Sequence, residues 1–319
     1  MYPKGVVMTR VILHEVGLRD GLQMEHETVP TDLKLQWIRR LMGTGIDILQ
    51  IGSFVHPTKV PQMADTDELF QALRASREVP AEVTLSGLVL NERGLERALA
   101  SGCGMICVGV SASETHSMKN TGMSVADATR RILATAQKAR DAGLKVQVSV
   151  QSAFGCGFEG PVPPERVLAI VRRYHDAGFA AISLADTAGH AVPDQVERLF
   201  AEVAAVAGGG ELACHFHNTY GLGLANTCAA MRSGVTSFES SVAGLGGCPF
   251  TKVAGGNVCT EDFVHMLQHS GLREDVHLDR LTALAADIST FFGRDLPGSV
   301  YKVGEIPRGA VNTLPSVRS

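Results

Sequence analysis

Short apolar segments rich in β-branched residues alternate eight times with helix-patterned segments along the chain. The expected strands cover residues 11–16, 46–51, 83–88, 105–110, 146–150, 180–184, 212–215 and 236–240. The expected helices cover residues 33–42, 65–75, 92–100, 125–142, 164–177, 193–206, 222–232 and 261–269. Strands that alternate with helices of this length form parallel β-α-β units. The sequence therefore predicts a repeated α/β architecture.

Two architectures fit such a repeat, an open doubly wound sheet and a closed barrel. The open sheet should carry a glycine-rich phosphate turn after its first strand, but residues 15–21 read EVGLRDG without that pattern. A barrel of eight units usually takes about 250 residues, which fits residues 11–270. Several expected helices end at a glycine that reverses the chain into the next strand, namely Gly45, Gly102, Gly143, Gly178 and Gly234.

We therefore predict a (β/α)8 TIM barrel with a short C-terminal helical extension. The barrel is expected over about residues 11–270 of a single domain that covers residues 1–319. A further helix over 278–292 and a glycine- and proline-containing tail fall within the extension, residues 271–319.

Composition narrows the classes of function. The net charge is −4 and no basic run occurs, so we expect no nucleic-acid partner. No apolar run approaches the roughly 18 residues of a membrane-spanning helix, and the first ten residues do not have the pattern of a signal peptide. The seven cysteines include no C-x-x-C pair, which favours a reducing compartment over a disulfide framework. The expected protein is a cytoplasmic enzyme that does not bind membranes.

The most informative polar residues lie where the expected strands end. Catalytic groups of such barrels gather at the carboxyl ends of the strands, and Arg19 and Asp20 follow the first strand. This pair could serve catalysis or form a structural ion pair. His215 and His217 are two residues apart and point to one face of the seventh strand. They could bind a metal or be core histidines that donate to backbone carbonyls. Taken together, these groups and an added amide oxygen favour Mg²⁺ or Mn²⁺.

A glycine-rich segment follows the eighth expected strand. It contains GLGGCP at residues 244–249 and GGN at 255–257. Such a segment permits close approach of the backbone to a ligand or forms a flexible lid. Cys248 within it is a candidate acid or nucleophile.

Five stretches carry a resemblance to a known family. They are EVGLRDGLQ (15–23), SFVHPTKVPQMAD (53–65), SLADT (183–187), CHFHNTYGLGLAN (214–226) and SVAGLGGCPF with its downstream GGN (241–257). In these stretches the chain resembles the 3-hydroxy-3-methylglutaryl-CoA lyases, within the wider group of barrel metal lyases and Claisen-type synthases. The resemblance extends in the same order over nearly the whole barrel.

The resemblance implies a set of site residues. The implied metal ligands are Asp20, His215, His217 and Asn257. The implied catalytic residues are Arg19, Asp20, His215 and Cys248, with Arg19 beside a developing enolate oxygen and Cys248 or His215 as the acid. The expected substrate-binding residues are Gln23, Gln50, Ser149, Gln151, Asp186 and Thr187. Lys119 and Asn120, placed by the sequence in a polar loop after the fourth strand, are candidate contacts for coenzyme A or ordinary solvated surface.

The reaction that the resemblance implies is retro-Claisen cleavage of a 3-hydroxyacyl-CoA to an acyl-CoA and a keto-acid. It implies a divalent cation, Mg²⁺ or Mn²⁺, and a homo-oligomer, a dimer or larger.

The chain departs from the family pattern at three single residues and on the fifth strand. The family usually has Glu at Gln50, Asp at Asn218 and Lys at His26. On the fifth strand, Ser149 stands where Tyr is common, and Gln151-Ser152 stands where Ser-Cys is common. Loss of a carboxylate and a Tyr should change the pocket that recognises the acyl group. We therefore expect the chemistry to persist, with a substrate that is hydroxymethylglutaryl-CoA, a related thioester or a free hydroxy-acid.

Two other classes of protein remain open at this level. Condensing acyltransferases of the isopropylmalate or homocitrate synthase kind share the Arg-Asp and H-x-H elements, but lack the AGLGGCP segment. A barrel that binds a ligand without turning it over is conceivable because of Gln50. The retention of Arg19, Asp20, both histidines and Cys248 argues against it.

Overall fold

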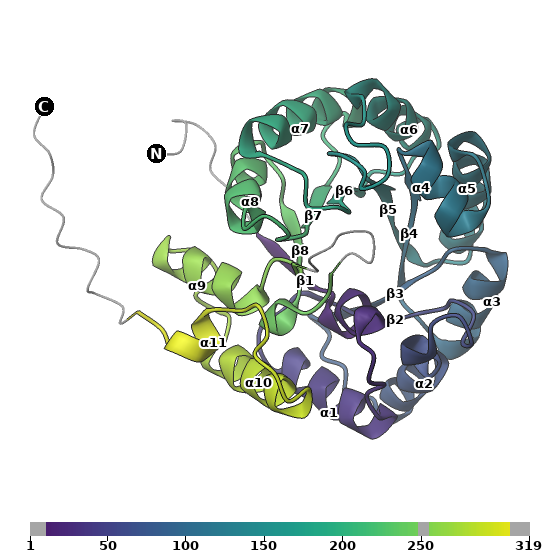
Figure 1. Ribbon diagram of the computed structural model, residues 1–319. Helices are drawn as coiled ribbons and strands as arrows, with labels where there is room; N and C mark the ends of the chain where they lie inside the picture. Colours follow the sequence, from purple (N-terminus) through teal and green to yellow (C-terminus); the bar gives the residue numbers. More distant parts are fainter. Residues whose placement is uncertain (1–10, 248–254, 307–319) are drawn as a thin grey trace, which may run out of the picture.

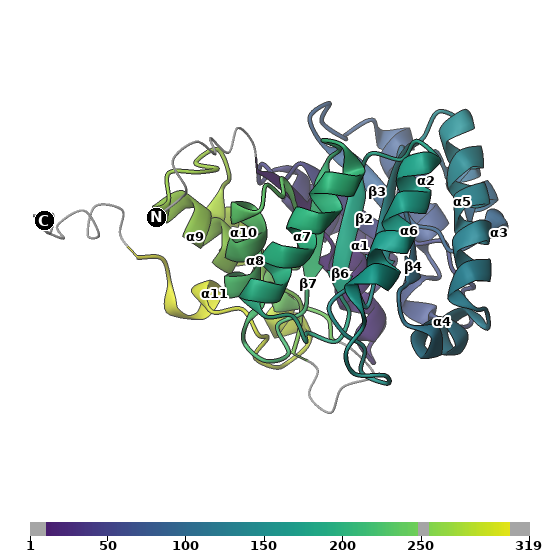
Figure 2. The ribbon, with the colours of Figure 1, turned by 90° about the horizontal axis from the view of Figure 1, so that it is seen from above.

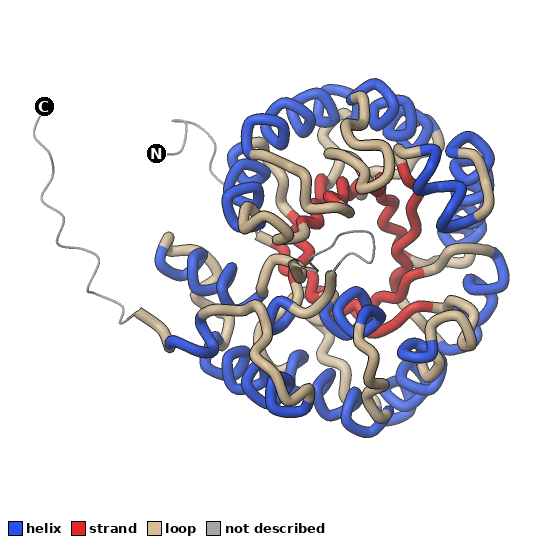
Figure 3. Tube along the Cα trace, viewed as in Figure 1, coloured by secondary structure: helices blue, strands red, loops and turns tan. Residues whose placement is uncertain are grey.

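The structure, a computed structural model, describes residues 11–247 and 255–306. Eight parallel strands form a closed barrel in the order β1 to β8, and β8 pairs with β1. The strands are β1 (Ile12–Glu15), β2 (Ile48–Ser53), β3 (Thr84–Leu88), β4 (Met105–Ser111), β5 (Lys145–Gln151), β6 (Ile182–Asp186), β7 (Leu212–Phe216) and β8 (Ser237–Ser240). They form the inner ring in Figures 1 and 3, with helices outside it. The predicted TIM barrel is confirmed.

Each helix of the outer ring buries one apolar face against the strands. The ring consists of α1 (Thr31–Met42), α2 (Thr66–Ser76), α3 (Glu92–Ser101), α5 (Val125–Asp141), α6 (Pro164–Asp176), α7 (Pro193–Ala207) and α8 (Gly223–Arg232). In α1, for example, Leu35, Ile38 and Leu41 recur at the spacing of one helical face and are buried. After β8 come α9 (Thr260–His269), α10 (Leu278–Phe291) and α11 (Val300–Val303), which lie together at one side of the barrel (Figure 2).

The sequence located every strand of the barrel, because most strand residues are buried and turns bound each strand. The glycines expected at the ends of helices all adopt positive φ, between 79° and 90°, at Gly45, Gly102, Gly143, Gly178 and Gly234. No described helix is long and apolar enough to cross a membrane.

One local prediction was wrong. The polar segment after β4 is not a loop but contains a short helix, α4 (Glu114–Thr121). The Ser113 side chain accepts a hydrogen bond from the His116 amide at the start of this helix, and Gly122 ends it with φ 72°. Both capping signals are present in the sequence, but α4 has few apolar positions to mark it.

Candidate active site

The turn after β1 carries Arg19 and Asp20 on a single buried helical turn, Gly17–Gly21. The Glu15 carboxylate anchors this turn by accepting from the amides of Gly17 (2.7 Å) and Val242 (2.9 Å). A side chain at Gly17 would lie 2.6 Å from the Glu15 carboxylate, so this position requires glycine. The chain therefore leaves β1 in a fixed direction, towards the segment that follows β8.

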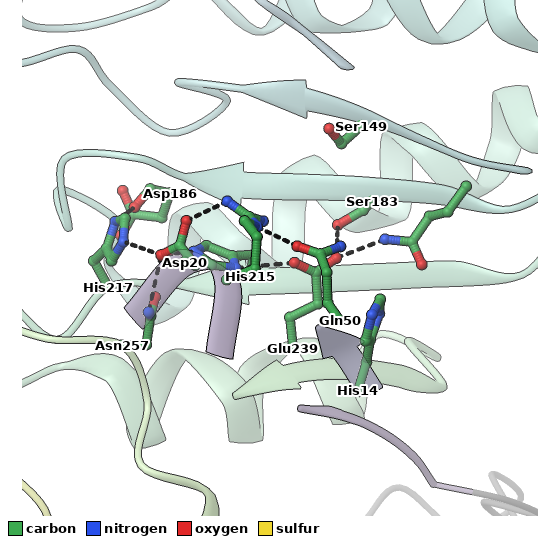
Figure 4. Close-up of polar contacts among 12 residues, drawn as sticks. His14, Asp20, Gln50, Ser149, Ser183, Asp186, His215, His217, Glu239 and Asn257 are labelled. Carbon is green, nitrogen blue, oxygen red and sulfur yellow. Dashed lines mark hydrogen bonds and ion pairs between the residues drawn. The ribbon is translucent and has the colours of Figure 1, made fainter. Parts of the chain in front are cut away.

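Asp20 is the centre of the site. Its Oδ1 accepts from Arg19 (2.5 Å) and from the Gln23 amide (3.1 Å). Its Oδ2 accepts from the Asn257 amide (2.9 Å) and lies 3.5 Å from His217 Nε2 and 3.8 Å from His215 Nε2. The residues predicted from the ends of β1 and β7 and from the segment after β8 therefore meet at one point (Figure 4).

Both imidazoles present the same nitrogen to Asp20. His217 Nδ1 lies 3.1 Å and 2.9 Å from the backbone oxygens of Asp186 and Thr187, and His215 Nδ1 lies 2.9 Å from Glu239. Since carbonyl and carboxylate oxygens only accept, each Nδ1 carries a proton, and in the neutral ring Nε2 then has a free lone pair. Asp20, His215 and His217 each offer one ligand atom, and these atoms lie within 4.8 Å of one another.

Two buried atoms support a cation at this point. His217 Nε2 and Asn257 Oδ1 are buried, and neither has a hydrogen-bond partner among the described residues. Asn257 is held by its own amide group, which donates to Asp20 and to the Leu245 carbonyl (3.0 Å). Gly246, at φ 113°, allows this approach, because a Cβ there would lie 2.4 Å from Asn257. One carboxylate, one amide oxygen and two imidazoles suit Mg²⁺ or Mn²⁺.

The electrostatics of the site keep Asp20 charged. Burial alone would raise the pKa of its carboxyl group, but the Arg19 guanidinium and the two imidazoles hold that pKa well below its usual value. Burial opposes protonation of His215, yet its hydrogen bond to Glu239 and the charge of Asp20 raise its pKa overall. Asp20 is therefore an anion at neutral pH.

A second polar cluster lies inside the barrel next to these candidate ligands. Glu239 on β8 accepts from Gln147 on β5 (2.6 Å) and from Ser183 on β6 (3.2 Å), besides His215 on β7. On the neighbouring strand β1, His14 stands in register with Glu239 and pairs with Ser86 on β3 at 3.0 Å. Sequence reasoning missed Glu239, although a glutamate that shares one face of a short strand with Ser237 is a signal for a buried, partnered carboxylate.

The residues predicted to bind substrate divide into two groups. Gln23 and Gln50 reach the centre, since Gln50 accepts a hydrogen bond from Arg19 Nε. Ser149 and Gln151 lie half-buried on β5, and Gln151 lines a small cavity with Ser111 and Asn120.

The other predicted side chains bind backbone instead. The Asp186 carboxylate accepts from the amides of His190 (2.8 Å) and Ala191 (3.0 Å), and Thr187 Oγ1 accepts from the Ser152 amide (2.9 Å). Their contact with the centre is through backbone oxygens, which hold His217.

The remaining predicted positions lie further out or outside the described residues. On α4, Lys119 Nζ lies 4.1 Å from the centre of the Phe158 ring. His26 is exposed, and the Asn218 amide oxygen accepts from the Gly223 amide at the start of α8. Cys248 lies outside the described residues.

Two buried carboxyl groups near the site predict how stability depends on pH. Burial raises the pKa of Glu15 to about 7 and that of Glu261 to about 8. Above pH 4.5 the unfolded chain releases these protons while the folded protein retains them, so stability falls as pH rises through the folded values. We expect the melting temperature to fall from pH 5 to pH 9, and to fall less in Glu261→Gln. Calorimetry at three pH values measures this, with the exposed Glu202→Gln as control; equal slopes in all three proteins would contradict it.

The barrel and its converging ligand atoms define a (β/α)8-barrel enzyme with a candidate divalent-metal centre. The sequence pattern of the HMGL-like family matches residues 10–288. The chain belongs to this family and is a carbon–carbon lyase.

Individual relatives agree over nearly the whole length. A hydroxymethylglutaryl-CoA lyase of Bacillus subtilis is 37% identical over 95% of this chain and 98% of its own length, and its crystal structure has a TM-score of 0.88. A hydroxymethylglutaryl-CoA lyase of Pseudomonas mevalonii is 38% identical over 90% of this chain and 94% of its own length. An HMG-CoA lyase of Acinetobacter baumannii, in complex with coenzyme A and 3-methylmalate, has a TM-score of 0.87 at 33% identity and covers 97% of this chain and 99% of its own.

Proposed function

We propose that this protein cleaves 3-hydroxy-3-methylglutaryl-CoA to acetyl-CoA and acetoacetate at a divalent-metal centre formed by Asp20, His215, His217 and Asn257. The observation that carries this proposal is the convergence of two imidazole Nε2 atoms on Asp20 Oδ2, at 3.5 and 3.8 Å. The names of the relatives that match nearly the whole chain support the substrate.

A bound Mg²⁺ or Mn²⁺ would hold the oxygens of the substrate and lower the pKa of its tertiary hydroxyl. A base takes the proton of the hydroxyl, the adjacent carbon–carbon bond breaks, and the electron pair of that bond passes to the α-carbon of the thioester to give an enolate. A ketone forms at the former hydroxyl carbon, which leaves as acetoacetate. Protonation of the enolate carbon then gives acetyl-CoA.

The residues of this chain have separate roles in that sequence. Arg19 is fixed between Asp20 and Gln50, so its planar cation can stabilise charge that develops on the enolate oxygen. Either Cys248 or His215 protonates the enolate carbon. Gln23 supports Asp20, and Asp186 and Thr187 support His217 through their backbone oxygens.

Gln50 and Ser149 bear on which acyl group is cleaved. Gln50 keeps the contact with Arg19 without the negative charge that the family pattern has at this position, and Ser149 is smaller than the usual Tyr. A branched hydroxy-diacid, 3-methylmalate, accompanies coenzyme A in the Acinetobacter baumannii relative. A related branched 3-hydroxyacyl-CoA is therefore the second candidate substrate.

Coenzyme A is proposed to contact the β4–α4 side of the barrel. Lys119 offers a cation beside an aromatic ring there, and Asn120 lines a cavity with Gln151. We also propose, from the family resemblance, a cytoplasmic enzyme that forms a homo-oligomer.

The test is a product assay on the full-length protein. Protein stripped with EDTA is expected to be inactive, and added Mn²⁺ or Mg²⁺ should restore release of equimolar acetoacetate and acetyl-CoA from hydroxymethylglutaryl-CoA. A panel of branched 3-hydroxyacyl-CoA thioesters, assayed in parallel, ranks the substrates by kcat/KM. Metal-independent turnover, or no cleavage of any thioester, would contradict the proposal. Release of free coenzyme A from acetyl-CoA and a keto-acid would instead indicate a condensing acyltransferase.

A further inference from the structure

Glu239 is a charged side chain in a place where barrels of this fold usually carry branched apolar ones. It lies on β8 and is 9% exposed. Its partner Gln147 belongs to β5, which is not a neighbour of β8 in the sheet. The contact therefore crosses the interior of the barrel. A buried carboxylate costs stability unless it is fully hydrogen-bonded, so its retention needs a reason.

The two carboxylate oxygens of Glu239 have different hydrogen-bond partners. Oε1 accepts from Gln147 Nε2 at 2.6 Å and from Ser183 Oγ at 3.2 Å. Oε2 faces His215 Nδ1 at 2.9 Å (Figure 4). Since the carboxylate only accepts, His215 must carry a proton on Nδ1, and in the neutral ring Nε2 is then free to face Asp20. Gln147, whose contact is the shorter of the two, in turn stops the carboxylate from rotating away.

The second imidazole, His217, also has its proton on Nδ1, but its hydrogen-bond acceptors are backbone oxygens. Backbone oxygens of Asp186 and Thr187 hold His217, so its tautomer is fixed by the fold of the β6–α7 connection. The two rings stand at 87° with centres 5.0 Å apart, and both direct Nε2 to Asp20. The acceptor for Nδ1–H is therefore a side chain, Glu239, in the case of His215, and the backbone in the case of His217.

We propose that Glu239 is a positioning residue of the metal centre, which fixes the Nδ1–H tautomer and the orientation of His215 so that Nε2 can bind the cation. This inference rests on the proposed function, because it takes Asp20, His215 and His217 as the ligands. A carboxylate that accepts from the outer nitrogen of a metal-bound histidine orients the ring and strengthens it as a ligand.

Glu239→Gln tests the proposal with little change in shape. Its amide has one oxygen to accept and one nitrogen that donates, so it cannot accept from both Gln147 and His215 as these side chains now stand. The Nε2–H tautomer of His215 becomes available, and in that tautomer the ligand atom is blocked. We expect the Kd of Mn²⁺, measured by titration calorimetry on the metal-free protein, to rise roughly 10–100-fold.

The matched control is Ser183→Ala, which removes a hydrogen bond to the same carboxylate and leaves the His215 contact. Its Mn²⁺ Kd is expected to stay within about threefold of wild type, since the His215 partner is retained. Long-range ¹H–¹⁵N correlation spectra of the metal-free proteins, recorded at a pH high enough for His215 to be neutral, report the tautomer directly. The His215 signal is identified by its loss in His215→Asn. We expect Nδ1–H in wild type and in Ser183→Ala, and Nε2–H to appear in Glu239→Gln.

The outcomes separate this inference from the proposed function. Unchanged Mn²⁺ affinity together with a retained Nδ1–H tautomer in Glu239→Gln would overturn the role of Glu239. If wild type binds no Mn²⁺ at a site that depends on Asp20, the proposed metal centre fails. The tautomer spectra, which need no metal, still test what Glu239 does to His215.

Discussion

Replacing Asp20 with alanine is expected to reduce turnover of hydroxymethylglutaryl-CoA by roughly 10³-fold or more, because the change removes a charge that both the cation and Arg19 require. Asp20 contacts Arg19, Asn257 and Gln23, and lies between the two imidazoles. No described neighbour supplies a second carboxylate that could take its place in the group of candidate ligand atoms. Binding of Mn²⁺ should weaken together with turnover.

Two quantities are measured on the purified variant. One is kcat at saturating metal and substrate, and the other is the Kd of Mn²⁺, from titration of the metal-free protein. Asp176→Ala is the control, since Asp176 is exposed at the end of α6 that lies away from the carboxyl ends of the strands. This control should match wild type in both quantities. Turnover by Asp20→Ala close to the wild-type rate would show that the chemistry does not use this centre.

The barrel could be predicted from the sequence because its repeat is regular. Most strands contain several apolar or β-branched residues, and glycines such as Gly102 and Gly178 end the preceding helix in the left-handed conformation. Helix α4 was missed, since it is short, polar and depends on its caps at Ser113 and Gly122 rather than on an apolar face. The periodicity of apolar residues therefore located the helices and strands that pack on the core. It did not locate a helix whose ends are defined by capping residues.

The candidate site was predictable to the extent that its residues lie at strand ends. Asp20 and His215 meet because parallel strands bring their carboxyl ends to one edge, which is a rule of topology. The partners of Glu239 could not be foreseen, because Gln147 is 92 residues away in sequence and the contact depends on how deep each side chain lies in the barrel. The depth of each side chain is set by the register between neighbouring strands around the closed barrel. A single sequence does not show that register.

Arg19 joins Asp20, the centre of the candidate site, to Gln50 on β2. Its Nη1 donates to Asp20 and its Nε donates to Gln50. A neutral amide at residue 50 orients the guanidinium without adding a second negative charge to compete with the substrate for it. The cation of Arg19 is therefore shared with one carboxylate only, and its remaining N–H donors suit an anionic oxygen that develops during the reaction.

Arg19→Lys is expected to lower kcat by about 10²–10³-fold with little change in KM, because an ammonium cannot bind Asp20 and Gln50 and still present a fixed planar donor to the enolate oxygen. Affinity for Mn²⁺ should be retained, since Arg19 is not a ligand. Arg273→Lys is the matched control: its side chain is 12% exposed against 11% for Arg19, and it pairs with Asp47 near the start of β2. That variant should lower the melting temperature and leave kcat unchanged. A rise in KM without loss of kcat in Arg19→Lys would assign Arg19 to substrate binding alone, because stabilisation specific to the transition state affects kcat.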